Sequence, residues 1–230
     1  MPGYVQSALL LVSWGRQLKR CPLGNTRVGT VMPQVFRIQP LMRPGTWRTE
    51  HRRYHEYVEQ ALQELGGLAA EVSRKWPADG PAFLPMTELP ADLHRLCRRR
   101  DHLSDSIRLF AAIAIEAFIN YYGVARLGAR QFNRHVERLP LHRKVELLLL
   151  VCDQVELDDR DELLAALSAV VEGRNELAHP KAAEIPDDSE LQSGDPQAAE
   201  KAVWAMRRFF ARFVALVPTS HHMIPGPRVV

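Results

Sequence analysis

Apolar residues recur at intervals of three or four along most of the chain, which is the spacing of one face of an α-helix. This pattern predicts five helices, over residues of about 48–76, 91–127, 141–155, 158–178 and 197–217. The 91–127 helix is the longest, and we expect it to be central. No stretch of alternating polar and apolar residues bounded by turn residues predicts a strand. The expected fold class is therefore all-α, an up-and-down bundle of about five helices.

Helix-breaking residues mark the segments between and around these helices. Residues 77–90 and 184–196 are rich in proline or other turn formers, so we expect loops there. Residues 1–47 contain many prolines and glycines, which predicts an arm without regular structure. The predicted organisation is an arm over 1–47, one helical domain over 48–217 and a tail over 218–230 that begins where Pro218 ends the last helix.

Size and composition fit one helical domain. The chain has 230 residues, of which 46% are hydrophobic, enough for one sizeable core. Three widely separated cysteines form no CxxC pair, which favours a reducing cytoplasm over a disulfide framework. The longest apolar run, Leu109–Ala125, contains Glu116 and Asn120 and is too polar for an ordinary membrane span. We therefore expect a core helix and no membrane partner.

The positive charge of the chain is concentrated near its start. Residues 1–53 hold nine lysines and arginines against one acidic residue, Glu50, so this segment carries +8 and residues 54–230 carry −5. A basic arm attracts phosphate backbones, because binding releases their counterions. The same composition is typical of a solvated, disordered leader, which is the simpler interpretation.

An arginine occupies a position where the fourth predicted helix should be apolar. The inward positions of this helix, separated by four, three and four residues, are Leu163, Leu167, Val170 and Arg174. A guanidinium remains charged at any accessible pH, so it must be paired, solvated in a groove or presented to an anion.

A histidine follows the arginine at the predicted end of the same helix. In an unbroken helix, His179 would point about 140° away from Arg174. Pro180 disfavours a helical conformation at the preceding residue, so the helix should end near Ala178 and the imidazole should turn back toward the guanidinium. We therefore expect Arg174, Asn175 and His179 to converge.

These three residue types suit RNA cleavage without a metal. Histidine exchanges protons near neutral pH, and a fixed cation stabilises charge on the scissile phosphate, with the ribose 2′-hydroxyl as nucleophile. Asn175 can orient the histidine or the phosphate. In the structural alternative, Arg174 caps helix carbonyls and His179 is a cation favoured by the helix dipole.

Two polar residues interrupt the apolar run of the longest helix. Glu116 and Asn120 stand four residues apart, so they share a helix face. They can support the site by orienting Arg174 or His179. Alternatively, they form a buried polar pair that fixes the register of the helices.

No cofactor or metal is expected. His51, His55 and Glu59 have the spacing of metal ligands on a helix, but no further ligands accompany them, and exposed positions on a charged helix are the simpler interpretation. Nucleotide-binding glycine patterns, HExxH and GxSxG are all missing from the sequence.

Two other short runs have both a functional and a simple interpretation. Arg98, Arg99 and Arg100 can contact RNA phosphates, although a solvated helical turn is commoner. Tyr121 and Tyr122 can stack on a base, although their spacing fits core packing better.

The run from Glu172 to Pro180, E-G-R-N-E-L-A-H-P, resembles the R-x4-H motif of the HEPN superfamily, including the polar residue after the arginine. The segment from Ala112 to Tyr122, A-I-A-I-E-A-F-I-N-Y-Y, is similar to the long helix that precedes the motif in that superfamily. The resemblance covers roughly residues 91–217.

The resemblance implies a HEPN-like homodimer that joins two motifs in a cleft and cleaves RNA without a metal, leaving a 2′,3′-cyclic phosphate. It implies that Arg174 and His179 are catalytic, with Asn175. An antitoxin or another regulatory protein is a possible partner, because many members act in toxin–antitoxin pairs, defence or stress responses. Some members do not cleave RNA, so the alternative is a noncatalytic helical module for dimerisation, RNA binding or partner binding.

Overall fold

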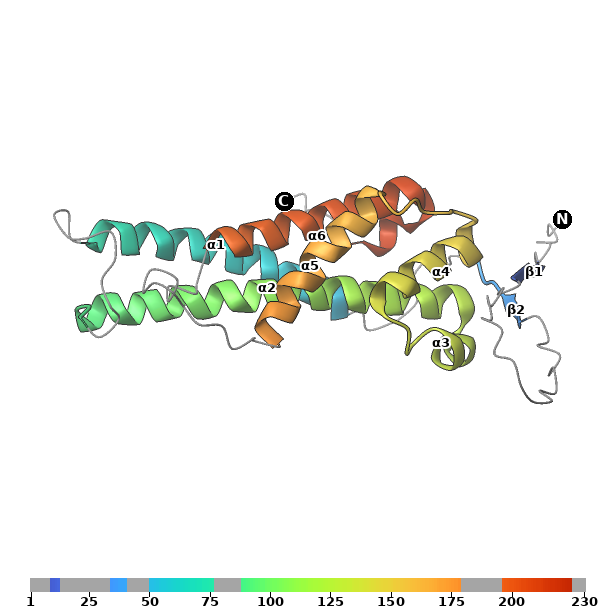
Figure 1. Ribbon diagram of the computed structural model, residues 1–230, viewed down its shortest axis with the longest axis horizontal. Coiled ribbons are helices and arrows are strands. Elements are labelled where there is room, and N and C mark those ends of the chain that lie inside the picture. Colours follow the sequence, from blue (N-terminus) through green and yellow to red (C-terminus); the bar gives the residue numbers. More distant parts are fainter. Residues whose placement is uncertain (1–8, 13–33, 41–49, 77–87, 179–195, 225–230) are drawn as a thin grey trace, which may run out of the picture. The chain divides into compact units, whose positions relative to one another are not determined.

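The structure, a computed structural model, describes residues 9–12, 34–40, 50–76, 88–178 and 196–224. Apart from one short pair of strands, these residues form helices and their connections, so the fold is an all-α helical bundle (Figure 1). The chain divides into two compact units, Met1–Met42 with Tyr122–Leu157 and Arg43–Tyr121 with Asp158–Val230. Residues of the predicted 48–217 domain contribute to both units.

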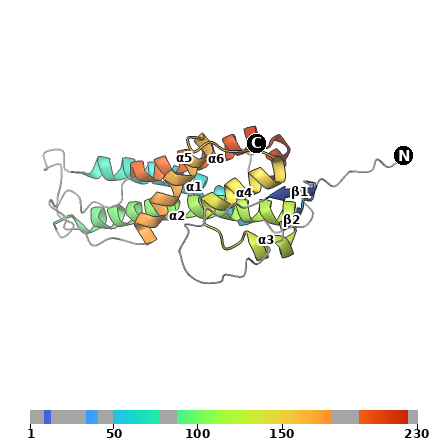
Figure 2. The same cartoon turned by 45° about the vertical axis from the view of Figure 1, so that its right-hand side comes forward.

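The larger unit contains most of the helices. Its elements are α1 (Glu50–Lys75), α2 (Ala91–Leu127) as far as Tyr121, α5 (Glu162–Ala178), α6 (Pro196–Leu216) and the 3-10 helix η2 (Pro218–Met223). The helices α1 and α2 are antiparallel, because Lys75 pairs with Asp92 near one end and His51 stacks on Tyr121 near the other. Both ribbon views show α5 crossing α2 at an angle (Figures 1 and 2).

The core of the larger unit is apolar and rich in aromatic rings. The helix α1 buries one side, which consists of Val58, Ala61, Leu65, Leu68 and Val72. Phe118 of α2 packs edge-to-face against Phe210 and Phe213 of α6, with ring centroids 5.3 and 4.9 Å apart. These contacts join α2 to α6, and Phe210 also packs edge-on against His55 of α1.

The smaller unit joins the last residues of α2 to α3 (Ala129–His135) and α4 (Leu141–Asp153). At Gly123 the backbone of α2 approaches the ring of Phe132, and a Cβ there would overlap this ring and lie 3.2 Å from Leu148. Tyr122 donates a hydrogen bond to the Asp153 carboxylate, which also pairs with Arg126 at 3.0 Å. Burial raises the pKa of both Tyr122 and Asp153.

The described part of the arm is more ordered than the sequence predicts. The strands β1 (Leu9–Val12) and β2 (Gln34–Arg37) pair antiparallel, with Leu10 opposite Phe36. Phe36 is buried against the edge of His135, and the Gln39 amide donates to the Arg126 carbonyl. Alternation over four residues is too short a signal to predict such a strand. The rest of the arm lies outside the described residues.

The five predicted helices are confirmed as α1, α2, α4, α5 and α6, with α2 at the predicted bounds. Besides the two strands, the structure adds two short helices that the sequence pattern did not predict. These are the short helix α3, with the single buried residue Phe132, and η2 in the predicted tail. Met223 of η2 is buried, and its carbonyl accepts a hydrogen bond from His51 at 2.8 Å.

Among the described helices, α2 is the one long and apolar enough to cross a membrane, with an 18-residue window of mean hydropathy 1.4. Half of that window is buried inside the protein, a pattern that core helices share.

Candidate functional site

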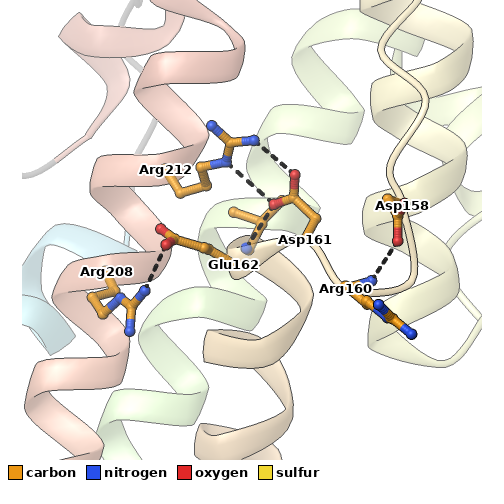
Figure 3. Close-up of polar contacts among 7 residues, drawn as sticks. Asp158, Arg160, Asp161, Glu162, Arg208 and Arg212 are labelled. Carbon is orange, nitrogen blue, oxygen red and sulfur yellow. Dashed lines mark hydrogen bonds and ion pairs between the residues drawn. The ribbon is translucent and has the colours of Figure 1, made fainter.

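The helix that carries Arg174 begins at an aspartate cap, and its first residues are tied to α6. The Asp161 carboxylate accepts a hydrogen bond from the Leu163 amide at 2.8 Å. It also accepts hydrogen bonds from Nη2 and Nε of Arg212, at 2.7 and 3.2 Å (Figure 3). Asp158 accepts a hydrogen bond from the Arg160 amide in the turn before the helix. The helix therefore begins at Glu162, four residues after the start of the predicted range 158–178, because several aspartates precede α5 and each can cap.

The predicted apolar stripe of α5 leads directly to Arg174. Leu163 and Leu167 are fully buried and Val170 is 1% exposed. One turn later, the Arg174 side chain is 30% exposed. The stripe therefore fixes the rotation of α5, and this rotation places the guanidinium at the border between core and solvent.

Arg174 has two partners within the described residues. Its Nη1 lies 3.4 Å from Oε2 of Glu116, and its Nε and Nη2 lie 3.4 and 3.2 Å from Oδ1 of Asn175. These distances are long for hydrogen bonds to a charged group, and the Glu116 side chain is itself 38% exposed. The guanidinium is therefore oriented by both partners and still open to a stronger anion.

Three of the predicted site residues are thus brought together, namely Arg174, Asn175 and Glu116. Asn175 is exposed at the last turns of α5. Asn120 lies one turn after Glu116 on α2 and is half-buried. His179 directly follows the end of α5 and lies outside the described residues.

A second ion pair between α2 and α5 was not predicted. Arg108 of α2 pairs with Glu176 of α5, and Arg108 also lies beside Gly173. The Arg108 side chain is 12% exposed, so this arginine is more enclosed than Arg174. The signal in the sequence was a cation eight residues before Glu116, about 80° around the helix and therefore on a neighbouring side of α2. Two ion pairs therefore connect the last turns of α5 to α2. In one the arginine belongs to α2, and in the other it belongs to α5.

The three residues with metal-ligand spacing have other roles. His51 is 1% exposed rather than at the surface as predicted, and its Nε2 donates to the Met223 carbonyl. His55 and Glu59 are half-buried, and the Glu59 carboxylate pairs with Arg207. Burial lowers the pKa of both histidines. Among the described residues, no group of three histidine, cysteine or acidic side chains is placed to hold a metal ion.

The buried thiols and tyrosines belong to the core. Cys152 and Tyr122 are buried, and burial raises the pKa of the Cys152 thiol to about 12. A thiol with such a pKa is protonated at neutral pH and is a poor nucleophile. Tyr121 stacks on His51 with ring centroids 5.4 Å apart, so its ring is engaged within the protein, in agreement with the core interpretation.

No protein-family model, curated protein or solved structure matches this chain. The resemblance to the HEPN superfamily therefore depends on the sequence motif alone.

Proposed function

We propose that the chain is a metal-independent endoribonuclease of the HEPN type that acts in the cytoplasm. The observation that carries the proposal is the position of Arg174 at the end of an apolar helix stripe, partly exposed and held by long contacts to Glu116 and Asn175. A cation in this state can exchange a weakly held carboxylate for a phosphate, which offers the planar guanidinium two oxygens at once.

The proposed reaction uses the RNA itself as the source of the nucleophile. The 2′-oxygen attacks the adjacent phosphorus, the bond from phosphorus to the 5′-oxygen breaks, and the 2′-proton ends on the leaving 5′-oxygen. The products carry a 2′,3′-cyclic phosphate and a 5′-hydroxyl. His179 transfers the proton, Arg174 binds the nonbridging oxygens, and Asn175 and Glu116 hold the arginine in position.

A second copy of the chain is part of this proposal, because one helix exit supplies only part of a phosphate site. An antitoxin or another regulatory protein is the further partner class that the family resemblance implies. Nothing in the proposed chemistry requires a metal ion, because the arginine takes the place of a cation at the phosphate.

Cleavage assays with defined oligonucleotides test the proposal. Cleavage of RNA is expected to persist in EDTA and to end in a cyclic phosphate, while DNA and 2′-O-methyl RNA stay intact because they lack the 2′-hydroxyl. His179→Ala should lose roughly two to four orders of magnitude in rate if it transfers the proton. Arg174→Lys should also be impaired, since an ammonium cannot form the bidentate fork.

Arg160→Lys is the matched control, because Arg160 is exposed and its side chain has no role in the proposed site. It should cleave as the wild type does. Wild-type protein freed of any co-purifying inhibitor that leaves RNA intact, or a His179→Ala variant as fast as wild type, would rule out the catalytic assignment.

One observation favours a second candidate, a noncatalytic helical module that dimerises or binds RNA or a partner protein. Within the described residues, Arg174 is engaged by Glu116 and Asn175, as a purely structural arginine would be. This candidate predicts RNA binding or dimerisation without cleavage. The same assays therefore separate the two candidates.

A further inference from the structure

A basic groove lies on the larger unit between α1 and α2, away from Arg174. It is shallow and open to solvent, with a volume of about 570 Å³, and its charged lining consists of Glu64 from α1 and of Arg95, Arg98, Arg99 and His102 from α2. The four α2 residues follow one another at intervals of three, one and three, so they share one side of the helix.

The cations of this groove are only partly neutralised. Arg99 pairs with Glu64 across the groove. Arg95 and Arg98 are exposed, and within the part of the chain that the structure describes neither has a hydrogen bond or an ion pair. Three arginines therefore face one carboxylate, which leaves a positive site open to an anion.

An exposed aromatic ring lies beyond one end of the groove. Tyr57 is 38% exposed and stands seven residues, or about two turns, before Glu64 on the same side of α1. Its ring packs edge-on against Phe110 at 4.8 Å, and Phe110 follows the groove residue Ser106 by one turn of α2. One base can stack on such a ring while phosphates farther along the same strand lie among the arginines.

The groove and the Arg174 site occupy the same side of α2. Arg98 and Glu116 are eighteen residues apart, which is five full turns and about 27 Å along the helix. A strand whose scissile phosphate reaches Arg174 can therefore pass along α2 toward the groove. A combination of arginines and an exposed aromatic ring favours a flexible single strand over a rigid duplex, whose bases are not free to stack on a side chain.

We propose that this groove binds the sugar-phosphate backbone of single-stranded RNA through Arg95 and Arg98, with Tyr57 stacking on a base. That the bound strand is the substrate of the Arg174 site rests on the proposed function, whereas the binding itself does not. Arg95, Arg98 and Tyr57 are positioning residues that hold the strand at a distance from the reacting phosphate.

Fluorescence anisotropy of the full chain with a labelled 2′-O-methyl RNA of about 12 nucleotides tests the groove without cleavage. Each phosphate contact contributes about 0.7 to the slope of log K against log salt concentration for a single strand. The Arg95→Gln/Arg98→Gln variant should therefore reduce the slope by about 1.4 and weaken binding roughly 25-fold at 0.1 M salt. The matched control is Arg130→Gln/Arg134→Gln, which removes two exposed arginines from α3.

The tyrosine gives an independent variant. Tyr57→Ala should weaken RNA binding about fivefold or more. Tyr57→Phe should bind RNA as the wild type does, because stacking needs the ring and not the hydroxyl. Circular dichroism verifies that each variant keeps its helices. Equal losses in the two arginine pairs, tighter binding of duplex than of single strand, or binding of anionic vesicles in place of RNA would each overturn the proposal.

The outcomes for the groove and for the catalytic site are separable. Probe binding that depends on Arg95, Arg98 and Tyr57, in a protein that never cleaves RNA, supports the groove and refutes the proposed ribonuclease. Cleavage that depends on Arg174 and His179, with probe binding unchanged in the groove variants, refutes the groove alone.

Discussion

The guanidinium of Arg174 is held loosely enough to change partners. An ion pair of 3.4 Å with both side chains about one-third exposed is strongly screened by water. Such a pair contributes roughly 0.2–1 kcal/mol to stability. A phosphate that accepts two hydrogen bonds from the guanidinium can bind more strongly than this. The contact with Glu116 therefore orients Arg174 at little cost to its binding of an anion.

Removal of the Glu116 charge is expected to separate positioning from stability. Glu116→Gln should lower the free energy of unfolding by less than about 1 kcal/mol, because the pair is partly exposed. It should reduce kcat by about tenfold or more if the carboxylate orients Arg174 for the reaction. Steady-state kinetics and urea denaturation measure the two effects.

Glu162→Gln is the control, since it breaks an exposed pair with Arg208 at the opposite end of α5 from Arg174. It should have a similarly small effect on stability and leave kcat unchanged. If kcat falls equally in both variants, Glu116 has no specific role at the site.

Asp161 is expected to make the protein sensitive to acid. Hydrogen bonds from Arg212 hold the pKa of Asp161 below its usual value. Its contribution to stability is therefore complete above the unfolded pKa, near 4, and is lost as the pH falls through the lower folded value. Asp161→Asn keeps a capping side chain but removes the charge, so the free energy of unfolding should fall less steeply between about pH 5 and 2 than in the wild type.

Asp161→Ala serves as the comparison, because it removes the cap as well and should cost about 1 kcal/mol at neutral pH. Parallel pH profiles for the wild type and Asp161→Asn, measured by urea denaturation, would show that this carboxylate does not contribute.

At the scale of the elements, long apolar periodicity predicted the helices well and short elements poorly. The helix α2 was predicted at its observed bounds because its three- and four-residue spacing persists over 37 residues. The helix α3 has seven residues and one buried side chain, Phe132, which is too little for a periodic signal. The strand β2 is shorter still, with four residues, and only a partner far along the chain, His135, shows that Phe36 is buried.

Some features of the candidate site could likewise be predicted from the sequence, and others could not. The Arg174 position follows from a break in the apolar stripe of α5, which the sequence shows. For Glu116 the sequence left two alternatives, a contact with the site or a buried polar pair with Asn120, and the structure shows the contact with Arg174. The pairs of Arg108 with Glu176 and of Arg99 with Glu64 depend on which sides of two helices face each other. That information is tertiary, and for this reason the arginine run at residues 98–100 could be interpreted as an ordinary solvated turn.

The close packing of α2 on α3 gives a test of the smaller unit. Gly123→Ala places a Cβ within the Phe132 ring and 3.2 Å from Leu148, so the ring must shift. We expect a net loss of about 1–2 kcal/mol in the free energy of unfolding, because overpacking exceeds the gain in helix propensity. Thermal denaturation followed by circular dichroism measures it.

Gly66→Ala is the opposite case. A Cβ at Gly66 of α1 meets no atom within 4 Å, so the substitution should stabilise the protein by up to about 1 kcal/mol. Stabilisation by both substitutions would contradict the close contact at Gly123.

At the scale of the whole molecule, the proposed reaction requires two chains. We expect a dimer at micromolar concentration whose interface includes the region from Arg174 to His179, and sedimentation velocity measures it. A strict monomer, with and without RNA, would leave the composite site without support. Mixing Arg174→Ala and His179→Ala chains gives a sharper test, because activity recovers only if each site takes its arginine and its histidine from different chains.

The buried contact between His51 and Met223 also determines when the protein can finish folding. Its partners are 172 residues apart, and the smaller unit's helices are synthesised between them. At translation rates of about 5–20 residues per second, α1 must wait roughly 10–30 s on the ribosome before η2 emerges. During that interval the apolar side of α1 can pack on α2, as Val72 does with Leu93 and Cys97, but its contacts with α6 and η2 must form last.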